Sequence, residues 1–272
     1  MNTRGRIWFD QLAAGGAPVA GLPPSVLAAD TVLGERPARV LAVVPDPANP
    51  YARARGGEVG LREAWGLAAA VDEACRADRD GARRVLLAVV DVRGQAYGRR
   101  EEMLGIHLAC AAAVDAYASA RQAGHPVLAL LVGGAMSGAF LAHGYQAHRL
   151  LALDDAGVVV HAMGREAAAR VTRRSVAELD EFAAGQAPMS YRIADYAGLG
   201  LLHALIGGVD ADAPTAQQVQ RVRAALLEAL HGIGAAERDL SVRWTSAAAR
   251  SARAASVEVR ERLAAQWAPA PR

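Results

Sequence analysis

Residues 85–102, VLLAVVDVRGQAYGRREE, decide the fold. The first six are uninterrupted apolar residues, which is typical of a central strand buried on both faces of a sheet. An Asp-Val-Arg-Gly turn closes this strand, and Glu101 and Glu102 then open a helix that we expect to run to about Arg121. A second buried run follows at Val127 to Val132. Strand, helix and strand in this order form a βαβ unit, so the sequence predicts an α/β fold around a parallel sheet.

The same pattern extends on both sides of this unit. Residues 12–39 are dense in Gly and Pro, so together with the residues before them they are expected to form an irregular arm. We expect one α/β domain with helical extensions, divided into an N-terminal arm (1–39), a core (40–210) and C-terminal helices (211–272). Further strands are predicted at residues 40–44, 150–153, 158–161 and 201–206, and further helices at 59–76, 167–171, 176–183, 191–197, 214–231 and 246–267.

The composition excludes several kinds of chemistry. All 30 positive charges are arginine, so the chain has no lysine for a Schiff base, a Walker A loop, a Ser-Lys dyad or a biotinyl group. With 28 acidic residues the net charge is only +2, which gives no support for nucleic-acid binding. Two cysteines, Cys75 and Cys110, suffice for neither a disulfide framework nor a zinc site. The sequence has no long apolar segment, so we expect no membrane span and a cytoplasmic protein.

The strongest candidate for chemistry is VGGAMSGAFLA, residues 132–142. Its small residues lie between a buried strand and a short helix expected from Ala135 to Gly144. The free N–H groups of such a helix's first turn can bind negative charge that develops on an oxygen, which is an oxyanion hole. Small residues also permit close packing of a helix on a sheet, and the spacing alone leaves both interpretations open.

A second candidate loop, residues 91–102, also follows a buried strand and leads into a helix. If the two strands are neighbours, the backbone amides of both loops flank one pocket. Arg93, Arg99 or Arg100 could then hold a carboxylate or a phosphate. The alternative is an ordinary turn with solvated arginines.

These two segments carry a family resemblance. DVRGQAYGRREEMLGI (91–106) and VGGAMSGAFLA (132–142) resemble the gamma subunits of biotin-independent malonate decarboxylases, relatives of the carboxyltransferase subunits of acyl-CoA carboxylases in the crotonase superfamily. VVVHAMGREAAARV (158–171) and GLGLLHALIG (198–207) continue the resemblance, which spans roughly residues 40–210. It implies a crotonase-like spiral of ββα and βαβ units of the carboxyltransferase type, with a helical C-terminal extension.

The resemblance also implies a function and partners. The chain would pair with a homologous beta subunit as a heterodimer and work with an acyl carrier protein and an acyltransferase subunit. Together they would convert a malonyl thioester to an acetyl thioester and CO₂ by stabilising an enolate. The thioester would be carried on the coenzyme-A-like phosphopantetheine group of the carrier. The resemblance implies that this chain itself carries no cofactor and no biotin. No metal is expected either, because the histidines lack the spacing of metal ligands.

By carry-over from the family, the oxyanion donors fall at Gly138 and Ala139, with Ser137 adjacent. His161 is a candidate proton donor to the enolate carbon, although a structural histidine is the simpler interpretation. Met136 and Ala139 depart from the family's glycine-rich pattern and narrow the space near the thioester. The residues expected to line the substrate pocket are Arg93, Gly94, Gln95, Gly98, Gly133 and Gly134.

Two alternatives remain open at this stage. Clp-type serine peptidases share the superfamily fold, and Ser137 with His161 could form their nucleophile and base. The third member is missing, because Leu201, Leu202 and His203 stand where the peptidase has an aspartate, and Asp210 lies beyond a glycine break. The other alternative is a catalytically passive structural subunit, with all the chemistry in the beta subunit.

Overall fold

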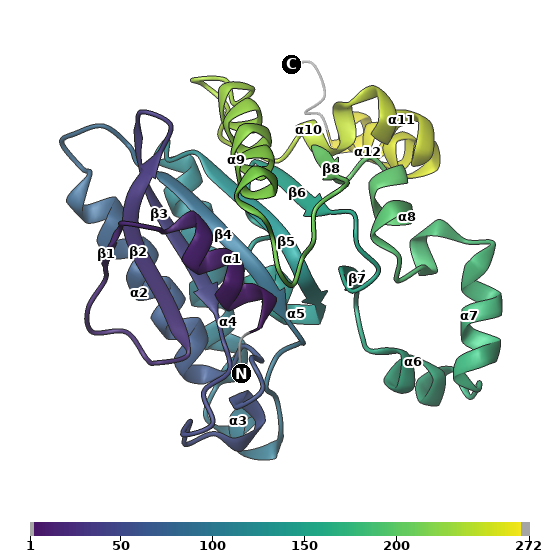
Figure 1. Ribbon diagram of the computed structural model, residues 1–272. Coiled ribbons are helices and arrows are strands. Elements are labelled where there is room, and N and C mark those ends of the chain that lie inside the picture. Colours follow the sequence, from purple (N-terminus) through teal and green to yellow (C-terminus); the bar gives the residue numbers. More distant parts are fainter. Residues whose placement is uncertain (1–2, 268–272) are drawn as a thin grey trace.

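An eight-stranded sheet organises the molecule, a computed structural model that describes residues 3–267 (Figure 1). The strands lie in the order β1-β2-β3-β4-β5-β6-β8, and β7 pairs with the end of β5. From β3 to β8 along this order the strands are parallel, whereas β1, β2 and β3 are antiparallel. The strands are β1 (Ala17–Pro18), β2 (Val26–Leu33), β3 (Arg36–Val43), β4 (Val85–Val92), β5 (Val127–Met136), β6 (Arg149–Leu153), β7 (Val159–His161) and β8 (Ala204–Ile206).

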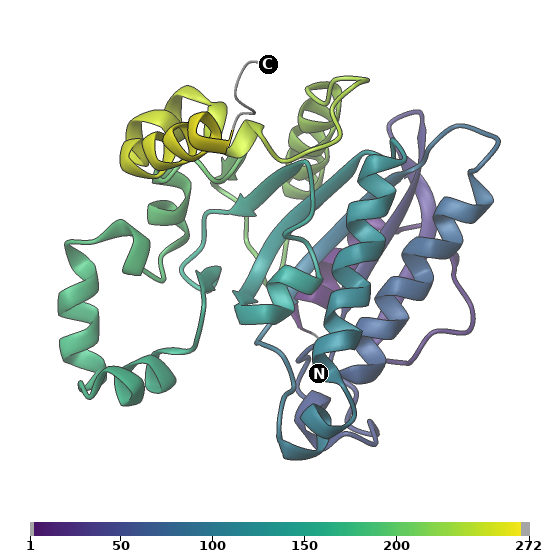
Figure 2. The same cartoon turned by 180° about the vertical axis from the view of Figure 1, so that it is seen from behind.

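Helices cover both faces of this sheet. Helices α1 (Arg4–Leu12) and α9 (Ala216–His231) lie on one face, and α2 (Leu61–Ala77) and α4 (Ile106–Gln122) lie side by side on the other (Figures 1 and 2). This double cover buries β4 and the first part of β5 almost completely, as their continuous apolar sequences predicted. Figure 1 shows α6 (Arg165–Thr172) and α7 (Val176–Ala184) projecting beyond β7, followed by η2 (Ala187–Met189) and α8 (Ile193–Gly198).

The irregular arm predicted for the N-terminal residues is wrong for most of its length. Residues 4–12 form α1, and β2 and β3 form an antiparallel hairpin that joins the sheet at its edge. The breaker residues lie mainly in the turns between these elements; Gly34, for example, occupies the β2–β3 turn with a φ of 62°. The division of the chain at residues 39 and 210 stays a prediction. Residues 1–2 and 268–272, at the two ends of the predicted arm and C-terminal helices, lie outside the described part.

Two helices are interrupted where the sequence predicted continuous ones. The helix expected from Glu101 to Arg121 is broken into α3 (Arg99–Met103) and α4, because Gly105 adopts a left-handed conformation with a φ of 80°. The expected helix 246–267 is divided into α11 (Ala247–Ala252) and α12 (Ala254–Trp267), preceded by α10 (Val242–Thr245). The break falls at Arg253, whose Nε donates a hydrogen bond to the Leu199 carbonyl at 2.9 Å. Among the helices of residues 3–267, none combines the length and the apolar character needed to cross a bilayer.

Candidate active site

Two loops meet at the carboxyl ends of β4 and β5. The strands are neighbours, and their last paired residues are Val92 and Ala135. Beyond this point the Gln95 side chain reaches across, and its Oε1 accepts a hydrogen bond from the backbone N–H of Gly138 at 2.9 Å. The expectation that the loops face one another is therefore confirmed.

The loop after β5 is a sharp turn from strand to helix. Strand β5 continues through Gly133 and Gly134 to Met136, and α5 (Ser137–Ala142) begins at the next residue. The helix expected to start at Ala135 is therefore two residues shorter at this end, because Ala135 and Met136 continue the strand and, with Gly134, pair with β7. Ser137 makes the turn with a φ of 58°, a left-handed backbone conformation that residues other than glycine rarely adopt. The first-turn N–H groups of α5, which have no acceptor within the helix, therefore lie at the end of the strand.

Short helix α5 is anchored at its other end by His143. The backbone N–H of His143 donates to the Ala139 carbonyl at 2.9 Å. Its ring lies 3.0 Å from the Val89 carbonyl through Nε2 and 3.1 Å from the Tyr117 hydroxyl through Nδ1. Burial lowers the pKa of His143 to about 4, so the ring is neutral near pH 7. The anchor ties α5 to β4 and α4, and Ala139 itself is fully buried.

The two glycines in β5 face Asp91 and the neighbouring strand. Asp91 Oδ1 accepts a hydrogen bond from the Gly134 N–H at 3.1 Å, and Oδ2 accepts one from the Gly5 N–H at 3.0 Å. A Cβ at Gly133 would collide with the Asp91 carboxylate, and one at Gly134 would lie 3.0 Å from the Val92 carbonyl. The geometry therefore gives both glycines a packing role. The sequence motif contains Asp91, but no local signal indicates that its carboxylate links α1 and β5 to the end of β4.

The loop after β4 is held in place by Val59, a residue that the sequence did not assign to the site. Val59 donates to the Gly94 carbonyl at 3.0 Å and accepts from the Ala96 N–H at 2.8 Å, which forms a parallel bridge between Val59 and Gln95. Gly94 has a φ of 145°, a conformation that favours glycine. Val59 lies in the connection between β3 and α2, and the available signal was that β3 ends at the same edge of the parallel sheet as β4.

A polar cavity of about 520 Å³ lies beside this loop. Arg93 is exposed, and Gly98 precedes α3 where a side chain would collide with Arg53. Gln95 and Gly98 therefore line this cavity together with residues 52–58 of the connection between β3 and α2. Its lining residues are Ala52, Arg53, Gly56, Glu58, Gln95, Ala96, Tyr97 and Gly98.

His161 ends β7 and lies in register with Met136, next to Ser137. Its ring stacks on Tyr191 with 3.9 Å between centroids, and its Nδ1 lies 3.0 Å from the Met163 carbonyl. Burial lowers the pKa of His161, outweighing the opposite effect of the Met163 and Met189 backbone groups. Within residues 3–267 the structure shows no hydrogen bond between Ser137 and His161.

The serine-hydrolase alternative also lacks an acid. Asp210 Oδ1 accepts the backbone N–H groups of Asp212 and Ala213, both at 2.9 Å, so it caps its own turn. A catalytic triad needs a carboxylate on the histidine ring, and Asp210 is engaged elsewhere. The described residues contain no group of three or more His, Cys, Asp or Glu side chains arranged to hold a metal ion.

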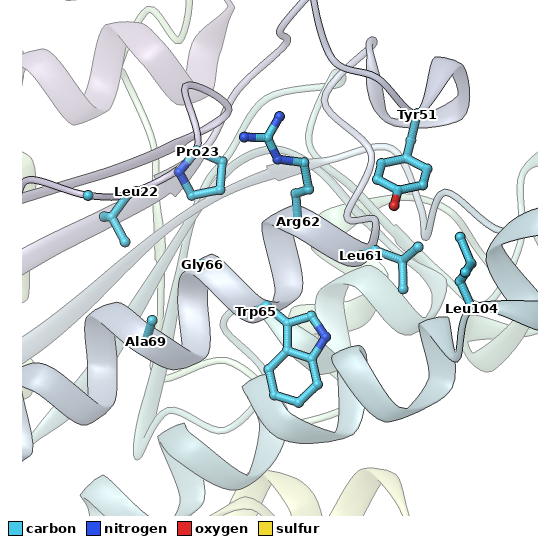
Figure 3. A pocket seen from close by; sticks show the side chains of 10 residues that line it. Leu22, Pro23, Tyr51, Leu61, Arg62, Trp65, Gly66, Ala69 and Leu104 are labelled. Carbon is cyan, nitrogen blue, oxygen red and sulfur yellow. The ribbon is translucent and has the colours of Figure 1, made fainter.

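A more apolar cavity of about 500 Å³ lies on the outer side of α2. Figure 3 shows Trp65, Leu61 and Arg62 on this helix, with Tyr51 and Leu104 beside them. None of the ten predicted site residues lines this cavity. The meeting of the two loops, and not this cavity, is therefore the candidate active site.

Comparison with known proteins fits this geometry. Residues 54–267 match the family model of the malonate decarboxylase gamma subunit. The chain belongs to this family. The chain in a crystal structure of a Pseudomonas malonate decarboxylase hetero-tetramer with coenzyme A is 57% identical, with a TM-score of 0.92 and coverage of 97% of this chain and 100% of that one. A Pseudomonas MdcD–MdcE hetero-dimer gives 57% identity, the same coverage and a TM-score of 0.90.

More distant relatives of the gamma subunit confirm the fold class. The malonyl-S-ACP:biotin-protein carboxyltransferase MADD of Malonomonas rubra is 36% identical over 129 residues, which are 46% of this chain and 44% of that protein. The chain thus matches less than half the length of that curated relative. The transcarboxylase 12S core is 21% identical, with a TM-score of 0.59. The match covers 81% of this chain and 40% of the transcarboxylase chain, and it shows that the two share a fold. The predicted crotonase-like α/β fold of the carboxyltransferase type is therefore confirmed.

Proposed function

We propose that this gamma subunit, paired with a homologous beta subunit, decarboxylates a malonyl thioester to an acetyl thioester and CO₂. The thioester is carried on the phosphopantetheine arm of an acyl carrier subunit, which an acyltransferase subunit loads. The gamma-subunit family and the hetero-dimer of the 57% identical relatives support the pairing. Biotin has no attachment point on this chain, because the chain has no lysine. Its two free cysteines agree with the cytoplasm, which stays a prediction.

The reaction needs a place for one negative charge. The bond between the carboxylate carbon and C2 breaks, its electron pair moves into the thioester, and CO₂ leaves. The resulting enolate carries charge on the thioester oxygen and is then protonated on carbon. Preorganised N–H donors at that oxygen lower the barrier, and one such donor typically contributes about 3–4 kcal/mol.

The backbone N–H groups of Gly138 and Ala139 supply these donors. The observation that carries the proposal is the hydrogen bond from the Gly138 N–H to Gln95 Oε1, because this donor already holds a carbonyl oxygen between the two loops. Ser137 aims the helix through its left-handed turn. We assign Gly94, Gln95 and Gly98 to the opposing wall and the exposed Arg93 to the leaving carboxylate. Gly133 and Gly134 allow β5 to pack close to Asp91 and Val92 of β4.

His161 is the proposed proton donor to the enolate carbon. The pairing of β7 with β5 puts it one residue from Ser137 in register. Burial lowers its pKa, so the protonated ring is a stronger acid than a free imidazolium, although the neutral ring is the major form near pH 7. This role is secondary to the oxyanion donors, since proton transfer follows the loss of CO₂.

The test is CO₂ release from a malonyl thioester by the assembled complex, compared with the same partners lacking this chain. We expect release and stoichiometric acetyl thioester only when the gamma subunit is present. A passive structural role predicts instead that every substitution at Gly138 leaves turnover unchanged while the complex remains assembled.

A further inference from the structure

The Gln95 carboxamide occupies the position that the proposed function gives to the thioester oxygen. Its Oε1 is an sp² carbonyl oxygen, 2.9 Å from the Gly138 nitrogen. Gly138 has a single backbone N–H, and this N–H is already directed at the carboxamide oxygen. A thioester oxygen can reach this donor only if the carboxamide moves away.

The backbone of Gln95 is fixed independently of its side chain. The bridge to Val59 uses only backbone groups, namely the Gly94 carbonyl and the Ala96 N–H. Gln95 is half-buried and lines the polar cavity of about 520 Å³, which also contains Arg53 and Tyr97. The side chain therefore has both a rigid base and a space into which it can turn, and the loop need not rearrange.

We propose that Gln95 is a positioning residue that holds the Gly138 donor in the absence of substrate and is displaced by the acyl oxygen of the thioester. This inference rests on the proposed function. It makes acyl binding a competition between two carbonyl oxygens for one N–H. A ligand without an acyl oxygen, such as the free-thiol carrier, does not enter this competition.

The competition has a measurable size. A neutral intramolecular hydrogen bond contributes about 0.5–1.5 kcal/mol net, so removing the internal acceptor strengthens acyl binding by roughly 2- to 10-fold. A carboxylate in place of the carboxamide is a stronger, charge-assisted acceptor and holds the donor more tightly. The two substitutions therefore act in opposite directions, which a purely structural role does not produce.

The experiment uses the assembled complex with Gln95→Ala, Gln95→Glu and wild type, and Gln217→Ala, an exposed glutamine of α9, as the control. Inhibition constants are measured for the acetyl carrier, which bears the acyl oxygen, and for the free-thiol carrier. We expect Gln95→Ala to improve acetyl-carrier inhibition by roughly 2- to 10-fold and to lower KM without lowering kcat. Gln95→Glu should weaken acetyl-carrier inhibition, with recovery as the carboxylate is protonated at lower pH.

Free-thiol inhibition should stay constant in all variants. An Ala variant whose acetyl-carrier inhibition is unchanged or weaker, or in which both ligands shift equally, overturns the inference. Failure of the proposed function is distinguished by a separate result, namely a Gly138→Val complex as active as wild type.

Discussion

Asp91 accepts a hydrogen bond from the backbone N–H of Gly134 at 3.1 Å and thereby joins the end of β4 to the end of β5. Its second oxygen holds the Gly5 N–H at the start of α1. One carboxylate thus satisfies two backbone donors from distant parts of the chain. The two loops of the candidate site begin within a few residues of this contact, so the carboxylate reinforces the pairing of β4 and β5 at the point where the loops leave the sheet.

Asp91→Ala should destabilise the protein by about 2–4 kcal/mol, because two partly buried N–H groups lose their acceptor. Asp91→Asn keeps the shape but only one acceptor oxygen, so it should cost about half as much. Urea unfolding monitored by circular dichroism measures both. Equal stability of Asp91→Ala and wild type would show that water replaces the carboxylate at no cost.

Ser137→Gly should preserve turnover and raise stability by about 1 kcal/mol, because glycine adopts the left-handed conformation at Ser137 without strain. Ser137→Ala removes the hydroxyl and should also retain turnover to within a few-fold. The measurements are CO₂ release, the melting temperature and labelling by a fluorophosphonate, which we expect to be absent. If both variants are inactive and wild type is labelled, Ser137 is a nucleophile and the hydrolase alternative is correct.

Acid should weaken the anchor of α5. The pKa of His143 is lowered to about 4 by burial, whereas an unfolded histidine titrates near 6.5. Between these values the unfolded state binds the extra proton, so stability is complete above about pH 6.5 and is lost as the pH falls towards 4. The loss due to this ring is at most about 3 kcal/mol. His143→Gln should flatten the dependence of the unfolding free energy on pH, and an identical slope in the variant would contradict the assignment.

The parallel core was predictable from the sequence, but the edge of the sheet was not. The runs at 85–90 and 127–132 are short, rich in valine and leucine and apolar at every position, which is typical of strands buried on both faces. Residues 40–43 of β3 fall within the strand predicted at 40–44, but β2 and the start of β3 do not, because Gly34 lies in the turn between them and Pro37 lies in β3, so local breaker signals outweighed their pairing. Pairing energy depends on the neighbouring strand, which a single window of sequence does not contain.

The sequence predicted that two loops form the site, but it did not predict the contacts between them. Parallel strand order brings the loops after β4 and β5 together, and this follows from the sequence. The Gln95–Gly138 hydrogen bond depends on a side-chain rotamer and on the left-handed turn at Ser137, and neither has a local signal. The bridge between Val59 and Gln95 joins loops after different strands, so it emerges only from the folded chain.

The most direct test of the oxyanion assignment is the rate of CO₂ release by the assembled complex carrying Gly138→Val. The control is Gly185→Val, at an exposed glycine after α7 with no atom within 4 Å of an added Cβ. We predict that Gly138→Val lowers kcat by roughly 10²- to 10³-fold while the complex still assembles, and that Gly185→Val has no effect. Full activity of an assembled Gly138→Val complex would contradict the claim that this subunit holds the thioester oxygen.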